Sequence, residues 1–79
     1  MLWCRVEEEG GGVSRVNVMH PNGEILFSYP PHTFTPELLG RMRTGQIRAS
    51  LSHAGQDGRR LLTVEDDAGH VVFEEWIPS

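Results

Sequence analysis

The chain has 79 residues, a mass of 8.9 kDa and a formal net charge of −4. This length supports at most one domain with a thin core, because a chain so short hides only a little over ~60% of its unfolded surface. The composition, 38% hydrophobic and 23% charged residues, argues against a disordered chain, and the negative charge argues against direct binding to nucleic acid.

Three strands are expected before residue 30. Apolar residues alternate within Leu2–Val6, Val13–His20 and Ile25–Tyr29, and a period of two is typical of a strand with one apolar face. We expect residues 7–12 to form a loop or a loose hairpin end, because consecutive glycines lose too much backbone entropy inside a strand. Asn22-Gly23 predicts a tight turn before the third strand. Pro30-Pro31 should end that strand, since proline cannot donate to a ladder.

One short helix is expected from Pro36 to about Gly45. Thr35 is a good N-cap, Pro36 suits the first helical position, and Phe34 and Leu39 have the spacing of a hydrophobic staple. Gly45 can end the helix. Its apolar face would hold Leu38, Leu39 and Met42, whereas Arg41 and Arg43 would lie near its C-terminal end.

Period two returns after the helix. Strands are expected over 47–51, reaching toward His53, and over 59–65 and 70–76, with turns at 54–58 and 66–69. The expected fold is therefore α+β, in the order βββ-α-βββ. Two antiparallel three-stranded meanders would form an open sheet or a two-layer sandwich with the helix.

The two halves of the chain resemble each other. Val16-x-Val18 before Gly23-x-Ile25-x-Phe27 matches Leu62-x-Val64 before Gly69-x-Val71-x-Phe73 at an offset of 46. The match between Leu2-x-Cys4-x-Val6 and Ile47-x-Ala49-x-Leu51 has an offset of 45. An internal duplication is one interpretation. The other is that hairpins often place a glycine before alternating apolar residues.

The sequence offers no close set of metal ligands and no evident cofactor motif. The four histidines, at positions 20, 32, 53 and 70, are too far apart to form a ligand pair, and each is expected in a turn, in a loop or at a strand end. Cys4 lies on the apolar face of its strand, where a cysteine acts as a small hydrophobic residue and a poor nucleophile. Gly10-Gly11-Gly12 is not followed by the Lys-Ser/Thr of a phosphate-binding loop. We therefore expect neither a metal nor a cofactor.

A nuclease-like set is the main enzymatic alternative. His53, Asp57, Arg59 and Arg60 lie close together in the sequence and could surround one turn. Small nucleases are usually basic because they must hold a polyanion, and this chain is acidic.

Charged and aromatic residues suggest a binding surface instead. The acidic clusters Glu7-Glu8-Glu9, 65–67 and Glu74-Glu75 are either solvated hairpin ends or a surface for a basic partner. Trp3 and Trp76 should point away from the main apolar face, so they are either covered within the molecule or anchor an interface.

We therefore expect a non-enzymatic protein–protein interaction module, most specifically a small acidic inhibitor or adaptor of the kind that phages and other mobile elements direct at host machinery. A small nuclease and a self-assembling structural subunit are the alternatives, and unpaired edge strands favour a homodimer. The lone cysteine, the absence of an apolar segment after Met1 and the lack of a membrane-spanning run favour a cytoplasmic protein. The candidate interaction residues are Trp3, Trp76, Glu7, Glu8, Glu9, Glu74, Glu75, Arg41 and Arg43.

Overall fold

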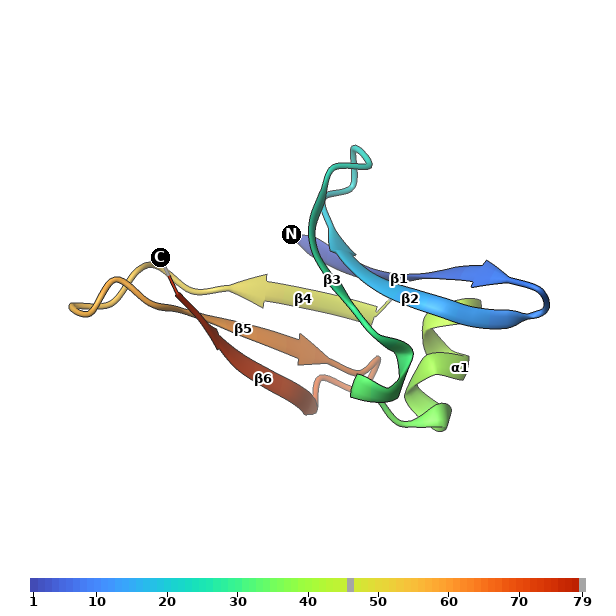
Figure 1. Cartoon of the computed structure of the whole chain (residues 1–79). Helices are drawn as coiled ribbons and strands as arrows, with labels where there is room; N and C mark the ends of the chain where they lie inside the picture. Colours follow the sequence, from blue (N-terminus) through green and yellow to red (C-terminus); the bar gives the residue numbers. More distant parts are fainter. Residues whose placement is uncertain (46, 79) are drawn as a thin grey trace.

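The computed structural model describes residues 1–45 and 47–78, and its element order is the expected βββ-α-βββ (Figure 1). A short 3₁₀ helix, η1, precedes the α-helix, and among the described residues no helix is long and apolar enough to cross a membrane. The elements are β1 (Leu2–Glu9), β2 (Gly12–Met19), β3 (Ile25–Tyr29), η1 (Pro31–Thr33), α1 (Pro36–Thr44), β4 (Ile47–Leu51), β5 (Arg60–Glu65) and β6 (Val71–Ile77).

The six strands form one antiparallel sheet in the order β3-β2-β1-β4-β5-β6. The first strands of the two halves, β1 and β4, pair with each other at the centre of the sheet, where Leu2 pairs with Ala49 and Cys4 with Ile47. The sheet is strongly bent into a half-barrel (Figure 1). Tyr29 on β3 and Phe73 on β6 belong to opposite edges, yet their ring centroids are only 5.6 Å apart. Of the two arrangements expected, the structure therefore has a single sheet.

The core lies on the concave face of this sheet. Four side chains are fully enclosed there, those of Val16, Val18, Leu62 and Val64. The helix α1 adds Leu38 and Met42 to this core. The helix begins as expected, because the Thr35 hydroxyl accepts the backbone N–H of Leu38 at 3.2 Å. The buried core residues are Leu2, Cys4, Val16, Val18, Phe34, Leu38, Met42, Ile47, Ala49, Leu62 and Val64.

The loop or loose hairpin end expected over residues 7–12 is present only at the turn of the hairpin. β1 continues to Glu9 and the turn is confined to Gly10 and Gly11, which adopt positive φ angles of 62° and 84°. A bulge between Glu7 and Glu8 shifts the register, so that Glu7 pairs with Arg15 and Glu9 with Gly12. Pairing with β2 thus overrides the weak strand preference of three glutamates, which are stabilised by partners distant in the sequence.

The hairpins β2–β3 and β5–β6 have the same backbone pattern. The N–H groups of Gly23 and Gly69 donate to the carbonyls of the residues three positions earlier, and each hairpin has a bulge next to its turn. The register leaves Leu26 in β3 and Val72 in β6 as the extra residues. The turn glycine and the bulged residue of the second hairpin each lie 46 positions after their counterparts in the first hairpin. This is the offset seen in the apolar pattern.

Candidate interaction surface

The large exposed hydrophobic side chains are concentrated on the two edge strands. Ile25 and Leu26 lie on β3, and Val71, Val72 and Trp76 lie on β6; among the described residues only Met1 joins them from elsewhere. Each edge strand has one strand neighbour within the sheet, so one side of its backbone is free to pair. We use the term β6 edge surface for Val71, Val72, Glu74, Glu75 and Trp76.

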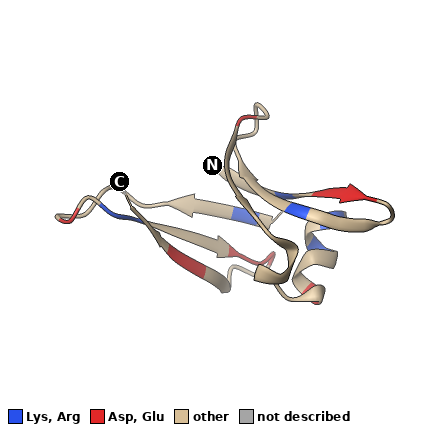
Figure 2. Cartoon of the chain, viewed as in Figure 1, with Lys and Arg blue, Asp and Glu red and all other residues tan. Residues whose placement is uncertain are grey.

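Two adjacent glutamates, Glu74 and Glu75, place negative charge on β6 (Figure 2). Glu74 pairs with Thr63 and Glu75 with Leu62, whose side chain belongs to the buried concave face. The Glu75 charge acts on Tyr29, which lies on the opposite edge of the half-barrel. Burial contributes most, and the Glu75 charge next, to raising the pKa of Tyr29 to about 12. Glu75 therefore faces the concave side, and Glu74 faces the convex side.

Trp76 lies at the far end of β6, where it is 53% exposed. It pairs with Leu61, and the Arg59 guanidinium lies over its ring at 5.0 Å from the centroid. The Arg59 contact leaves more than half of the Trp76 side chain open to solvent. An exposed, partly stacked tryptophan is the kind of residue that anchors protein interfaces.

A hollow of about 330 Å³ lies between α1 and β6. The buried side chains of Phe34 and Leu38 contribute to its lining, together with Arg41 from the helix and Val72 from β6. Val72 remains 41% exposed beside this space. The hollow thus adds a recess to the β6 edge surface. Its apolar part is formed by Phe34, Leu38 and Val72, and the polar remainder of its lining is Thr33, Thr35, Glu37 and Arg41.

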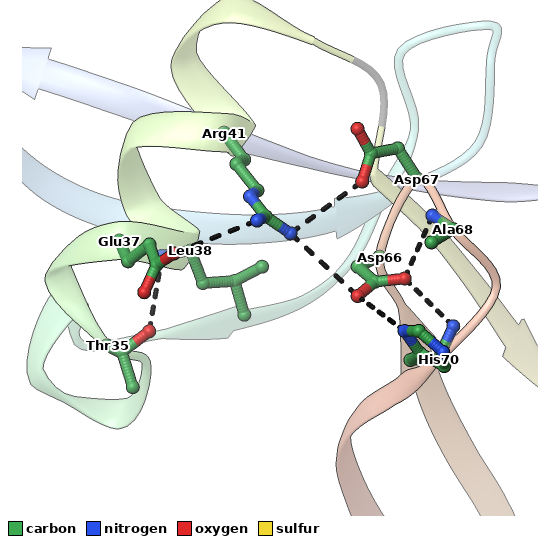
Figure 3. A network of polar contacts seen from close by, with 8 residues as sticks. All are labelled: Thr35, Glu37, Leu38, Arg41, Asp66, Asp67, Ala68 and His70. Atoms are coloured by element: carbon green, nitrogen blue, oxygen red, sulfur yellow. Dashed lines mark hydrogen bonds and ion pairs between the residues drawn. The ribbon is translucent and has the colours of Figure 1, made fainter.

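A polar network holds α1 against the β5–β6 turn and so positions this hollow (Figure 3). The Arg41 guanidinium lies 3.7 Å from Glu37, 3.8 Å from Asp66 and 3.6 Å from Asp67. Asp66 also accepts the backbone N–H groups of His70 and Ala68, at 2.8 and 2.9 Å. The N–H of His70 contributes most to holding the pKa of Asp66 below its ordinary value. Arg41 therefore has a structural role, because its ion pairs connect α1 to the β5–β6 turn.

Arg43 also connects the helix to the sheet. Its Nε lies 2.7 Å from Glu8 at the end of β1, and this ion pair ties α1 to the β1–β2 hairpin. Glu7 accepts the side-chain N–H of the buried Asn17 at 2.9 Å, while Glu9 is exposed at the strand end. These glutamates belong to β1, which β4 and β5 separate from β6 in the sheet order.

Trp3 lies apart from Trp76, near the centre of the sheet. It is half-buried and pairs with Arg48, whose guanidinium lies 5.9 Å from the centroid of its ring. The residues proposed from the sequence therefore do not form one surface. Glu74, Glu75 and Trp76 come together on β6, whereas Trp3 and the glutamates of β1 lie elsewhere.

The nuclease-like set is only partly assembled. Asp57 binds Arg59 at 2.6 Å, and the backbone N–H and side chain of Arg59 lower the pKa of Asp57. Neither hydrogen bonds nor ion pairs connect His53 to Asp57 within residues 1–45 and 47–78. Over the same residues, no group of three His, Cys, Asp or Glu side chains could hold a metal ion. Cys4 is buried, and desolvation raises its pKa to about 12.

No protein-family model matches the chain, and neither a curated protein nor a solved structure matches it. Our sequence reasoning missed Val71, Val72 and the hollow beside them. The adjacent valines break the alternation of β6 and could have indicated a bulge.

Proposed function

We propose that the protein is a non-enzymatic protein-binding module, acting as a small acidic inhibitor or adaptor through its β6 edge surface. The observation that supports this most is the coincidence of three features on one strand. β6 has a free backbone edge, three exposed large hydrophobic residues and two exposed glutamates. Apolar anchors with a charged surround are typical of surfaces that recognise another protein.

Site-specific photo-crosslinking in cells of the native host tests this function. A photoreactive amino acid is placed at Trp76, and in a matched variant at Ser14 on the distant β1–β2 hairpin. We expect position 76 to capture one discrete partner protein that position 14 does not. The partner is then purified, and its affinity is measured for the unmodified chain and for Trp76→Glu.

A partner that binds the purified chain and is weakened at least tenfold by Trp76→Glu supports the proposal. Equal capture from both positions, or an affinity unchanged by Trp76→Glu, contradicts the choice of surface. Turnover of a substrate by the pure protein, lost on substitution of His53 by alanine, would favour the nuclease alternative.

Self-assembly is the second candidate, and the two free edges of the sheet favour it. β3 of one molecule and β6 of another could pair and continue the sheet, because each lacks a second neighbour. Sedimentation over a wide range of concentrations separates the two proposals. Concentration-dependent oligomers that Val72→Lys abolishes would support a homodimer or a larger structural assembly, whereas a monomer throughout favours a different partner.

We further propose that the two meanders are a pseudo-repeat and that the protein acts in the cytoplasm. The shared offset of the turns and bulges supports the repeat. A buried free cysteine is compatible with a reducing compartment.

A further inference from the structure

We propose that the free edge of β6 binds an extended basic segment of a partner by strand addition, with an adjoining apolar side chain seated in the hollow between α1 and β6. This inference rests on the proposed protein-binding function and names the chemistry of the partner. In strand addition the backbone of the incoming segment supplies the hydrogen bonds, and its alternating side chains supply the selectivity.

The negative charge of Glu74 and Glu75 on β6 favours a partner with two adjacent basic residues. Glu74 and Glu75 are exposed on opposite faces of β6, so a paired strand opposes them with two consecutive residues. Arginine or lysine at both positions would neutralise both carboxylates. Neither glutamate has an ion pair among the described residues, so neither charge is already neutralised within the chain.

The hollow favours an apolar residue in the partner, next to its basic pair. On the side of Glu74 that leads toward the turn, β6 continues to Phe73 and to the bulged Val72 that lines the hollow. A segment paired along this edge therefore places an apolar side chain next to its basic pair. That side chain would contact Phe34, Leu38 and Val72. For an antiparallel partner strand, the motif is two basic residues followed by one apolar residue.

The same charges disfavour pairing of β6 with a second copy of itself. An antiparallel pair centred on Glu74 sets this residue against its own copy. A pair centred on Glu75 likewise sets Glu75 against its own copy, and centring on Phe73 leaves the Glu74 side chains as diagonal neighbours. Like charges that face each other across two strands are destabilising. The edge is thus better matched to a basic strand than to itself.

The test uses the whole purified chain and labelled peptides of about nine residues, a usual strand length. The first peptide has a central Arg-Arg-Leu flanked by alternating threonine and valine, and the second has Glu-Glu-Leu in its place. Two more copies of the first peptide carry N-methyl groups on alternate amides, one on each edge of the extended peptide. Binding is followed by fluorescence anisotropy at low salt, where surface charges are least screened.

We expect the Arg-Arg-Leu peptide to bind at least tenfold more tightly than the Glu-Glu-Leu peptide. Glu74→Arg/Glu75→Arg should reverse this preference, because it exchanges the sign of both cross-strand pairs. Glu9→Arg/Glu24→Arg changes the net charge by the same amount away from β6 and should leave the preference intact. N-methylation should abolish binding on one edge of the peptide only, since a single edge faces β6.

Equal binding of both peptides, failure of all peptides to bind, or equal loss in both N-methylated copies would overturn strand addition at β6. Equal effects of the two charge-reversal variants would overturn it as well, because they would reveal a diffuse electrostatic attraction. The crosslinked partner remains as a separate readout. A partner that still requires Trp76 while the peptides fail would refute this inference and retain the proposed function.

Discussion

Replacing Phe34 by alanine should remove two of the three ring contacts that join the two edges of the half-barrel. Phe34 is buried, and its ring centroid lies 6.0 Å from that of Tyr29 on β3 and 5.0 Å from that of Phe73 on β6. Truncation of a buried phenylalanine costs about 3–5 kcal/mol, which includes the cavity left behind. A domain of this size has a free energy of unfolding of roughly 4–12 kcal/mol. Phe34→Ala should therefore remove a large part of the stability.

Chemical denaturation followed by tryptophan fluorescence measures this loss, and thermal melting measures it independently. At roughly 4–8 °C per kcal/mol for a small domain, the melting temperature should fall by at least about 12 °C. Phe34→Leu should lose less, because it keeps an apolar side chain and gives up only the ring contacts. His32→Ala is the control, since His32 is exposed in the same segment and its loss should cost under about 0.5 kcal/mol. A loss below about 1 kcal/mol in Phe34→Ala would refute the bridging role of the ring.

Four further outcomes are expected. Cys4, with its pKa raised to about 12, should react with a thiol reagent only after unfolding, as a chromogenic disulfide would report. Tyr29 is the single tyrosine of the chain, so phenolate absorbance should show directly that it titrates near pH 12. Gly23→Ala and Gly69→Ala should each cost about 1–2 kcal/mol in denaturation, because both residues have positive φ angles. The depressed pKa of Asp66 stabilises the fold above pH 3.8 and loses this effect as the pH falls. The excess stability of the unmodified chain over Asp66→Asn at neutral pH should therefore vanish in strong acid.

The local elements could be predicted because each has a short-range cause. Alternating apolar residues located the strands, and Thr35 with Pro36 located the start of α1. The order of the strands in the sheet could not be predicted, because the apolar pattern does not say which edges meet. Pairing of β1 with β4 depends on contacts between residues more than forty positions apart, such as Leu2 and Ala49.

One departure from the expected fold has a clear physical origin. Residues 7–12 were expected to form a loop or a loose hairpin end because consecutive glycines lose too much backbone entropy inside a strand. The structure extends β1 to Glu9, with Glu7 bound to Asn17 and Glu8 bound to Arg43. Partners that are distant in the sequence therefore decide the conformation of this segment.

The candidate site was predictable only in its chemistry. Charge and aromatic content pointed to Glu74, Glu75 and Trp76 without showing that they share a free edge. Arg41 and Arg43 were placed in the same list because of their charge alone. The structure gives both of them carboxylate partners within the chain, Asp66 after β5 for Arg41 and Glu8 on β1 for Arg43. Sequence reasoning could not separate a cation that binds a partner from one that fastens a helix.

The two edges of the sheet are protected by different means, and this difference carries functional information. β3 is only five residues long and is followed directly by Pro30 and Pro31, which cannot donate to a neighbouring strand. β6 is two residues longer, and its glutamates and its bulge are devices that discourage unwanted pairing. Charge, however, is a selective form of protection: it opposes a strand of like charge and attracts one of opposite charge. If β6 binds by the proposed strand addition, carboxylates beside exposed valines and a tryptophan would disfavour pairing of this edge with its own copy and favour pairing with a basic strand.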